Sequence, residues 1–303
     1  MRSSPWSRLG LLAACGVGSV ALAAAPPSYP TPEAAVQALV DAARAGDSAK
    51  VVAVLGGGAK PLVESGDAVA EHNAHERFVG LYDEDHALIP EGDDRRILQI
   101  GATQWPFPIP VVKGKAGWSW DSSAGVAELL ARRIGQNELN AIQVCLAISD
   151  AENEYLTLNP QNASPPHYAD KFISSTGKRD GLYWPTTEGE PPSPLGPGAA
   201  RATSEGYKLE QGKPAPFHGY MYRILSAQGP HAEGGAVSYL VKGVLYGGFA
   251  LVGYPAEYRK SGVMTFIVNH HGVVFQKDLG QDTASKAKAM KAFEPDSTWT
   301  QVP

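Results

Sequence analysis

The chain has 303 residues, a net charge of -5 and 43% hydrophobic side chains, which is enough for two globular domains with ordinary cores. Lys and Arg number 26 against 31 Asp and Glu, and no basic block stands out, so a nucleic-acid partner is disfavoured. The 33 Gly and 24 Pro residues predict many turns and irregular connections.

The first residues have the pattern of a secretory signal peptide. Arg2 and Arg8 form a positive flank, a run rich in Ala and Gly follows, and Ala21-Leu22-Ala23 fits an A-x-A cleavage site. The run is too short and too poor in Leu and Ile to favour a transmembrane anchor. We therefore expect residues 1–23 to be removed near Ala23, and the mature protein to be exported to the periplasm or cell envelope.

The two cysteines have different expected fates. "LAAC", which ends at Cys15, resembles a bacterial lipobox, and lipidation there would attach the chain to a membrane. The short apolar run before it favours ordinary cleavage instead. Cys145 is then the only cysteine of the mature chain, so no internal disulfide forms. It lies in the apolar stretch "AIQVCLAI", which predicts a buried thiol rather than a reactive one.

The first part of the mature chain predicts helices followed by strands. Thr31 can cap a helix, Pro32 suits its first position and Gly46 ends it. Two further helical segments precede "RRILQIG" and "IPVVKGKAGWSWD", which are typical of strands joined by a hairpin. Residues 28–123 are therefore expected to form a small α+β domain with helices on a curved antiparallel sheet.

The remainder of the chain predicts a second α+β unit over residues 124–303. A long helix begins near Ser122, and the apolar stripe Leu139, Ile142, Val144, Leu146 and Ile148 predicts that its middle is buried on most sides. Residues 159–218 are rich in Pro and Gly but contain aromatics, which indicates a long ordered loop. Alternating strands follow, so we expect the helix to be a spine packed on a second antiparallel sheet.

Several long motifs are similar to one known bacterial family. They include "GKRDGLYWPTTEGEPPSPLGP" and "GGFALVGYPAEYRKSGVMTFIVNHHGVVFQKDLG", and the similarity covers nearly the whole mature chain. The sequence resembles the family catalogued as domain of unknown function 2950. This resemblance implies an exported bacterial protein, and it supplies no catalytic residues because none are established for the family.

Two further resemblances concern the fold. The element order of the first part is similar to the cone-shaped fold of nuclear transport factor 2. The spine helix, long loop and strand pair "SGVMTFIVNHHGVV" resemble the soluble domains of type IV pilins and pseudopilins. A whole domain precedes the helix, which argues against assembly into a pilus by the usual route. His270 and His271 are then expected at the solvent-exposed turn, Asn269–Gly272, of a pilin-like hairpin.

One cluster has the residue types of a metal site. His72, His75 and Glu76 stand at i, i+3 and i+4 of a predicted helix, and two histidines with a carboxylate are acceptable zinc ligands. The pattern is not H-E-x-x-H, and a solvated helix face is the favoured interpretation. We expect no metal and no cofactor. His167, His218 and His231 stand in loops and are expected at the surface.

Aromatic residues suggest a second candidate site. Trp105, Trp118, Tyr183 and Trp184 stand around two Pro-rich segments, where they could line a groove for a peptide, glycan or lipid. Core packing is the favoured alternative, because large aromatics mostly serve burial. Glu188 and Glu190 could form a carboxylate pair, although local solvation explains them as well.

The sequence contains no nucleophile elbow, Walker motif, C-x-x-C pair or dinucleotide fingerprint. The favoured function is therefore a non-enzymatic binding or scaffold role, with an unknown envelope protein or small ligand as partner. A membrane is a partner only if Cys15 is lipidated. The alternative is a periplasmic enzyme of the hydrolase class, with its site in the first domain or at the domain interface.

Overall fold

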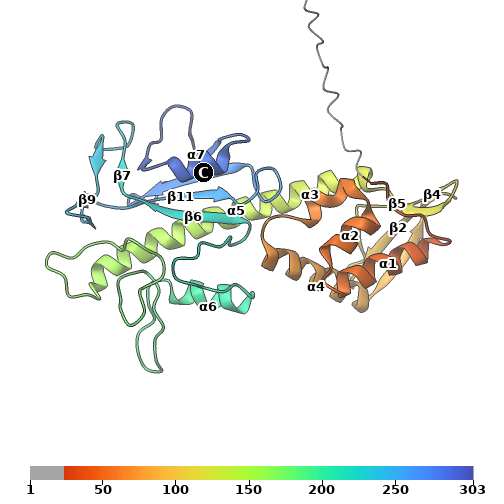
Figure 1. The fold of residues 1–303 in the computed structure, drawn as a ribbon, viewed down its shortest axis with the longest axis horizontal. Helices are drawn as coiled ribbons and strands as arrows, with labels where there is room; N and C mark the ends of the chain where they lie inside the picture. Colours follow the sequence, from red (N-terminus) through yellow and green to blue (C-terminus); the bar gives the residue numbers. More distant parts are fainter. Residues whose placement is uncertain (1–23, 303) are drawn as a thin grey trace, which may run out of the picture.

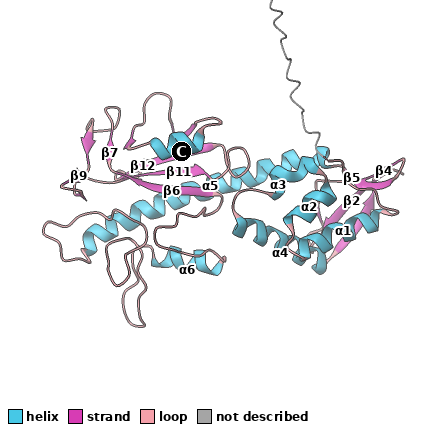
Figure 2. Ribbon diagram, viewed as in Figure 1, coloured by secondary structure: helices cyan, strands magenta, loops and turns pink. Residues whose placement is uncertain are grey.

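The protein, seen in a computed structural model that describes residues 24–302, has two lobes joined by one long helix (Figure 1). The predictions for Cys15 and for cleavage near Ala23 lie outside these residues. Helices pack on mainly antiparallel sheets in both lobes, which confirms the α+β class (Figure 2). No helix within residues 24–302 is long and apolar enough to cross a membrane.

The first lobe consists of helices followed by a small sheet. Its helical elements are α1 (Pro32–Arg44), α2 (Ser48–Leu55), a 3-10 turn (Gly57–Ala59), α3 (Lys60–Val63) and α4 (Ala68–Glu84). Its strands are β1 (His86–Pro90), β2 (Arg95–Ile100), β3 (Trp105–Pro106), β4 (Val111–Gly114) and β5 (Gly117–Trp120). The antiparallel order is β1-β2-β4-β5, with β3 also paired to β2.

Local sequence explains how α1 starts and where it packs. Thr31 Oγ1 accepts the N–H of Ala34 at 3.1 Å and Pro32 is the first helical residue, as predicted. The apolar face of α1 lies against the sheet, where the Trp120 indole N–H donates to the Ala35 carbonyl at 3.0 Å. The core of the first lobe therefore lies between α1 and the β4–β5 hairpin.

The spine helix α5 (Ser122–Leu158) contacts both lobes. A Cβ on Gly125 would lie 2.3 Å from the Pro108 carbonyl oxygen, so only glycine permits this approach to the first lobe. Farther along, Cys145 is fully buried against β11 (Ala250–Pro255), and a Cβ on Gly253 would lie 3.2 Å from its sulfur. The predicted burial of Cys145 is confirmed, and this burial raises the pKa of its thiol to about 12, which disfavours the reactive thiolate.

The second lobe is built on an antiparallel sheet whose two faces are both covered. Its order is β15 (Thr300–Gln301), β13 (Phe275–Asp278), β12 (Met264–Asn269), β11 and β6 (Tyr220–Leu225). Phe266 and Val268 face the core with α5, whereas Ile267 joins a core with α7 (Thr283–Ala289). Smaller sheets comprise β14 (Ala292–Phe293), β7 (Ala227–Gln228) and β8 (Val237–Ser238), and β9 (Leu240–Val241) with β10 (Val244–Leu245).

Two expectations differ from the structure. The middle of α5 is not buried on most sides: Leu139 is 61% exposed, and Ile142, Val144 and Leu146 are only half-buried. The sheet covers one face of the helix, so burial falls on Ala141, Cys145 and Ile148, and only Ile148 of these belongs to the predicted stripe. In addition, the ordered segment 159–218 contains a helix, α6 (Gly196–Ser204).

Candidate functional site

The polar face of α4 carries the residues considered as metal ligands. His72 Nε2 lies 3.2 Å from Glu76 Oε1, and their side chains are 62% and 68% exposed. His75 is half-buried, and desolvation lowers its pKa. Within residues 24–302, no group of three or more His, Cys, Asp or Glu side chains is placed to hold a metal ion. His72 and Glu76 thus form a surface pair on one helix.

The four aromatic residues are divided between the two lobes. Trp118 is buried in the core of the first lobe, and Trp105 packs at the edge of that core. Trp184 is buried in the core between α5 and the second-lobe sheet, and Tyr183 is half-buried beside it. The structure therefore does not bring these four side chains together at one surface.

The remaining histidines occupy local pairings. His86 stacks on Tyr82, and His231 pairs with Glu294. The predicted turn at Asn269–Gly272 is present, because the Gly272 N–H donates to the Asn269 carbonyl at 2.8 Å. His271 is exposed there, whereas His270 packs against Tyr239 and Phe249, so the expected solvent-exposed tip is wrong for His270.

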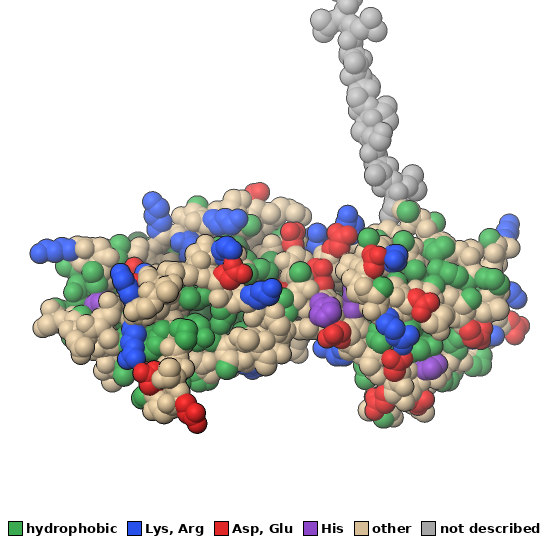
Figure 3. Space-filling model, turned by 60° about the horizontal axis from the view of Figure 1, so that its bottom comes forward, with side chains coloured by type: hydrophobic (Ala, Val, Ile, Leu, Met, Phe, Trp, Pro, Cys, Tyr) green, Lys and Arg blue, Asp and Glu red, His purple; other side chains and the backbone are tan. Residues whose placement is uncertain are grey.

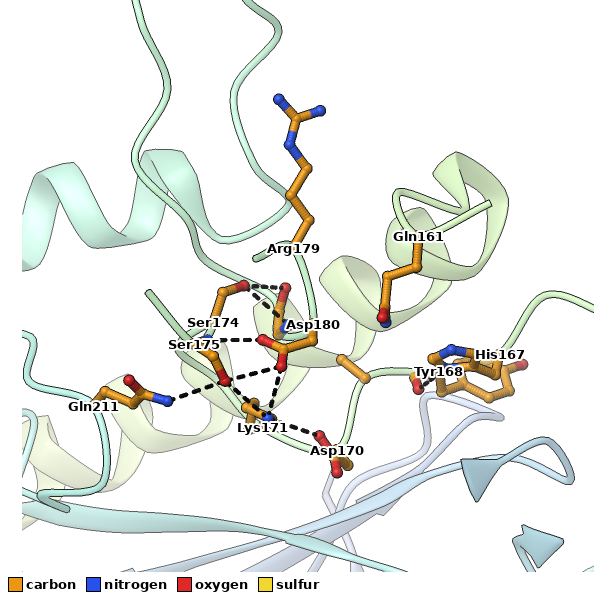
Figure 4. Close-up of polar contacts among 12 residues, drawn as sticks. Gln161, His167, Tyr168, Asp170, Lys171, Ser174, Ser175, Arg179, Asp180 and Gln211 are labelled. Carbon is orange, nitrogen blue, oxygen red and sulfur yellow. Dashed lines mark hydrogen bonds and ion pairs between the residues drawn. The ribbon is translucent and has the colours of Figure 1, made fainter. Parts of the chain in front are cut away.

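A polar cluster ties together the loop after α5 (Figure 4). Lys171 Nζ lies 3.1 Å from Asp180 Oδ2, and the Ser175 hydroxyl donates to the same oxygen at 2.9 Å. The Ser175 N–H donates to Asp180 Oδ1 at 2.7 Å. From a distant part of the loop, the Gln211 amide donates to Ser175 Oγ at 3.2 Å. Side chains predicted to lie in an ordered loop are thus held by specific bonds.

The charges in this cluster favour a structural role for Ser175 and disfavour activation of its hydroxyl as a nucleophile. Burial acts to raise the pKa of Asp180, but the Ser175 N–H and hydroxyl and the Lys171 ammonium together lower it to about 2. A lysine activates a serine only when its amine is neutral. Lys171 Nζ is 3.4 Å from Ser175 Oγ, yet it is paired with the ionised Asp180 carboxylate, which favours the charged ammonium. The nearby Glu188 and Glu190 are exposed, and Glu190 pairs with Arg179.

A second polar cluster, which we call the junction network, lies where the lobes meet. It consists of Asp67, Glu205, Tyr207, His218 and Gly219. Asp67 caps α4 through Oδ1, and its Oδ2 accepts the Tyr207 hydroxyl at 3.0 Å and the Gly219 N–H at 2.8 Å. His218 Nε2 lies 3.2 Å from Glu205 Oε2, and its backbone N–H donates to the Tyr207 hydroxyl at 3.2 Å.

The junction network combines buried charge with an accessible imidazole. Asp67 is 1% exposed, and burial together with the Asp67 charge raises the pKa of Tyr207, so its phenol remains a donor. Burial lowers the pKa of His218, and the Glu205 carboxylate opposes this shift. The His218 side chain is 18% exposed and its backbone φ is +50°, a conformation rare outside glycine. A neutral imidazole paired with a carboxylate can act as a general base.

Arginine and acidic side chains of α5 bind the backbone of both lobes close to this network. The Arg133 guanidinium donates to the Pro61 carbonyl at 2.7 Å and to the Leu62 carbonyl in the first lobe. It also donates to the Lys260 carbonyl at 3.0 Å in the second lobe. Glu138 Oε1 accepts the N–H of Met264, at the start of β12, at 3.0 Å. Burial lowers the pKa of Arg133 to about 10, so the guanidinium stays charged at neutral pH.

Comparison with known proteins identifies the family. The sequence model of the family described as Protein of unknown function (DUF2950) matches residues 27–302. The chain belongs to this family. No curated protein and no solved structure matches this DUF2950 protein.

The residues of the junction network have almost no signal in the sequence. Asp67 stands before a helical segment, which is typical of a capping residue. Its partners Tyr207 and Gly219 are 140 and 152 positions away, and no local pattern links them. His218 was expected at the surface, but the structure places it half-buried beside Tyr207 and Phe217.

Proposed function

We propose that this DUF2950 protein is an exported bacterial envelope protein with a non-enzymatic scaffold or binding role. The Arg133 guanidinium supports this most directly, because it binds carbonyls of both lobes from a helix that contacts both. Such a bridge suits a molecule that holds two binding surfaces in one fixed arrangement. The partner is an envelope protein or a small ligand.

Spin labels can test whether the two lobes keep one fixed arrangement. Cys145 is fully buried, so labels would attach to cysteines introduced at Lys115, in the β4–β5 turn, and at Lys288, at the end of α7. We expect one narrow inter-label distance distribution, broadened by Arg133→Ala and unchanged by Arg132→Ala. A broad distribution with Arg133 and Arg132 both intact would contradict the scaffold proposal.

The proposed location is supported by the sequence of residues 1–23. Mass spectrometry of the mature protein tests it. A chain that starts near Ala24 supports export with ordinary cleavage, whereas a lipidated chain that starts at Cys15 makes the protein a lipoprotein. A full-length chain in the cytoplasmic fraction would contradict export.

We also propose two domains, 28–123 and 124–303, and a pilin-like second domain. Support comes from the order of α5, the long loop and the antiparallel sheet, with β12 and β13 in the hairpin that holds the two histidines. An experimental structure of the second domain, compared with pilin soluble domains, would test this likeness.

The junction network favours a second candidate function, a hydrolase at the domain interface. The partly exposed His218–Glu205 pair provides a base, and the buried Tyr207 hydroxyl, which donates to Asp67, holds the His218 backbone in place by accepting its N–H. A panel of chromogenic ester, peptide and glycoside substrates tests this. Turnover that disappears in His218→Asn without a change in melting temperature would support the enzyme. Absence of turnover across the panel would favour the scaffold.

A further inference from the structure

The end of the second lobe farthest from the first carries an exposed apolar hairpin. β9 and β10 pair with Leu240 opposite Leu245 and Val241 opposite Val244. The turn residues Lys242 and Gly243 both have positive φ, +52° and +84°, which is the geometry of a tight type I′ hairpin. Figure 1 shows β9 at one end of the molecule, away from the first lobe. The hairpin is thus a well-defined projection.

Exposed apolar side chains concentrate on β9 of this hairpin and on the preceding strand, β8. Val237, Leu240 and Val241 are 42%, 40% and 51% exposed. In the part of the chain that the structure describes, no other exposed large hydrophobic residues lie within ten positions of one another. Beside them is an open hollow of about 510 Å³, lined by Pro165, Pro166, Val241, Lys242, Val244 and Tyr246. Exposed apolar side chains that gather beside an open hollow are typical of an interaction surface.

Two chain segments form this surface, which we call the tip surface: residues 160–168 and 237–249. They lie side by side, because the Tyr168 N–H donates to the Leu245 carbonyl at 3.0 Å and the His167 ring packs against Tyr246. Across the two segments together, Lys242 is the only Lys, Arg, Asp or Glu residue. Figure 3 shows hydrophobic and basic side chains at this end of the molecule. The tip surface is therefore apolar with a positive charge and no carboxylate of its own.

We propose that the tip surface binds a lipid bilayer that contains anionic lipids. Leu240 and Val241 would enter the boundary between headgroups and acyl chains, and Lys242 would contact lipid phosphates. Tyr246 has the amphipathic ring that favours the headgroup level. A second copy of the chain fits less well, because tip-to-tip contact would bring two Lys242 side chains together without a carboxylate in either surface. This inference deepens the proposed envelope role.

Insertion can be measured directly on the purified mature protein. Cys145 is fully buried, so an environment-sensitive NBD fluorophore would attach at Val241→Cys or, as a control, at Leu209→Cys. We expect a blue shift and higher intensity for the Val241 probe with phosphatidylglycerol vesicles, and no change for the Leu209 probe. Equal responses from the two probes, or none, would overturn the proposal.

Vesicle flotation separates the contributions of apolar side chains and of charge to membrane binding. Leu240→Glu should lower partitioning by about tenfold, because its half-exposed side chain can no longer be buried. Lys242→Gln should lower it about fivefold on phosphatidylglycerol and leave weaker binding to phosphatidylcholine unchanged. Leu209→Glu is the matched control, because Leu209 and Leu240 are both 40% exposed.

Two outcomes would refute membrane binding. One is unchanged flotation of Leu240→Glu, and the other is a concentration-dependent dimer in solution that Leu240→Glu abolishes. The vesicle experiments need neither export nor a fixed lobe arrangement. Their failure is therefore distinguishable from failure of the mass-spectrometric and spin-label tests.

Discussion

Glu152 is a carboxylic acid buried in the core of the second lobe. Its side chain is fully buried, and Oε2 accepts the Ala169 N–H at 2.9 Å. Oε1 has no hydrogen-bond partner within residues 24–302. Burial raises the pKa of Glu152 to about 8, although the Ala169 N–H opposes the shift. At neutral pH the carboxyl is therefore mostly protonated in the folded chain and ionised in the unfolded chain.

This difference predicts a pH-dependent stability. Between about pH 4.5 and pH 8 the folded chain binds the extra proton, so the contribution of Glu152 to the free energy of unfolding falls by about 1.4 kcal/mol per pH unit as pH rises. Glu152→Gln should remove this loss, so we expect its free energy of unfolding to exceed that of the natural chain by ~3 kcal/mol at pH 7. At pH 4 the two chains should have similar free energies of unfolding. Urea titrations across this range measure the difference. A pH-independent difference, or the same gain from exposed Glu154→Gln, would contradict it.

Tyr207 and Tyr258 make the same hydrogen bond in different surroundings. The Tyr207 hydroxyl donates to buried Asp67, and the Tyr258 hydroxyl donates to Asp278 at the surface, both at 3.0 Å. Tyr207→Phe leaves a buried carboxylate oxygen short of a donor, so we expect a loss of about 2 kcal/mol in unfolding free energy. Tyr258→Phe should cost less than about 0.5 kcal/mol, because water replaces the donor. Equal losses in chemical denaturation would show that the junction network adds little.

At the scale of elements, α5 contains two glycines with opposite surroundings. A Cβ on Gly125 would overlap the Pro108 carbonyl, whereas a Cβ on Gly135 would have no heavy atom within 4 Å apart from its chain neighbours and the backbone of its own helix. Gly135→Ala should raise the unfolding free energy by about 0.5–1 kcal/mol, because alanine favours the helix. Gly125→Ala should destabilise by about 2 kcal/mol, since backbone must move. Thermal melts of the two variants should therefore shift in opposite directions.

Elements with local signals were predictable, whereas their surroundings were not. The cap at Thr31, the hairpin β4–β5 and the turn at Asn269–Gly272 each depend on a few adjacent residues, and the structure contains all three. The exposure of Leu139 depends on which side of α5 the sheet covers, and periodicity alone does not determine that. The polar contacts of the candidate site are less predictable still, because Asp67 and its partners lie far apart in sequence.

At the scale of the molecule, two neighbouring arginines of α5 should differ greatly in their effects. Arg133 donates to carbonyls of both lobes, whereas Arg132 pairs with Glu128 at the surface. Arg133→Ala removes the donor from three partly buried carbonyls, those of Pro61, Leu62 and Lys260, so we expect a loss of about 3 kcal/mol and faster proteolysis between the lobes. Arg132→Ala should cost less than about 1 kcal/mol. Denaturation and limited trypsin digestion measure both, and similar behaviour would reject Arg133 as the bridge.

The length of the continuous helix α5 also fixes the rotation of one lobe relative to the other about the helix axis. Gly125 must face the first lobe while Cys145 faces β11, so the number of residues between them sets how one lobe is rotated relative to the other. One residue inserted between these contacts would turn the second lobe by about 100° and move it about 1.5 Å along the axis. An insertion of seven residues, close to two full turns, would restore the rotation and lengthen the molecule by about 10 Å. Length variation within this interval should therefore come in whole turns rather than in single residues.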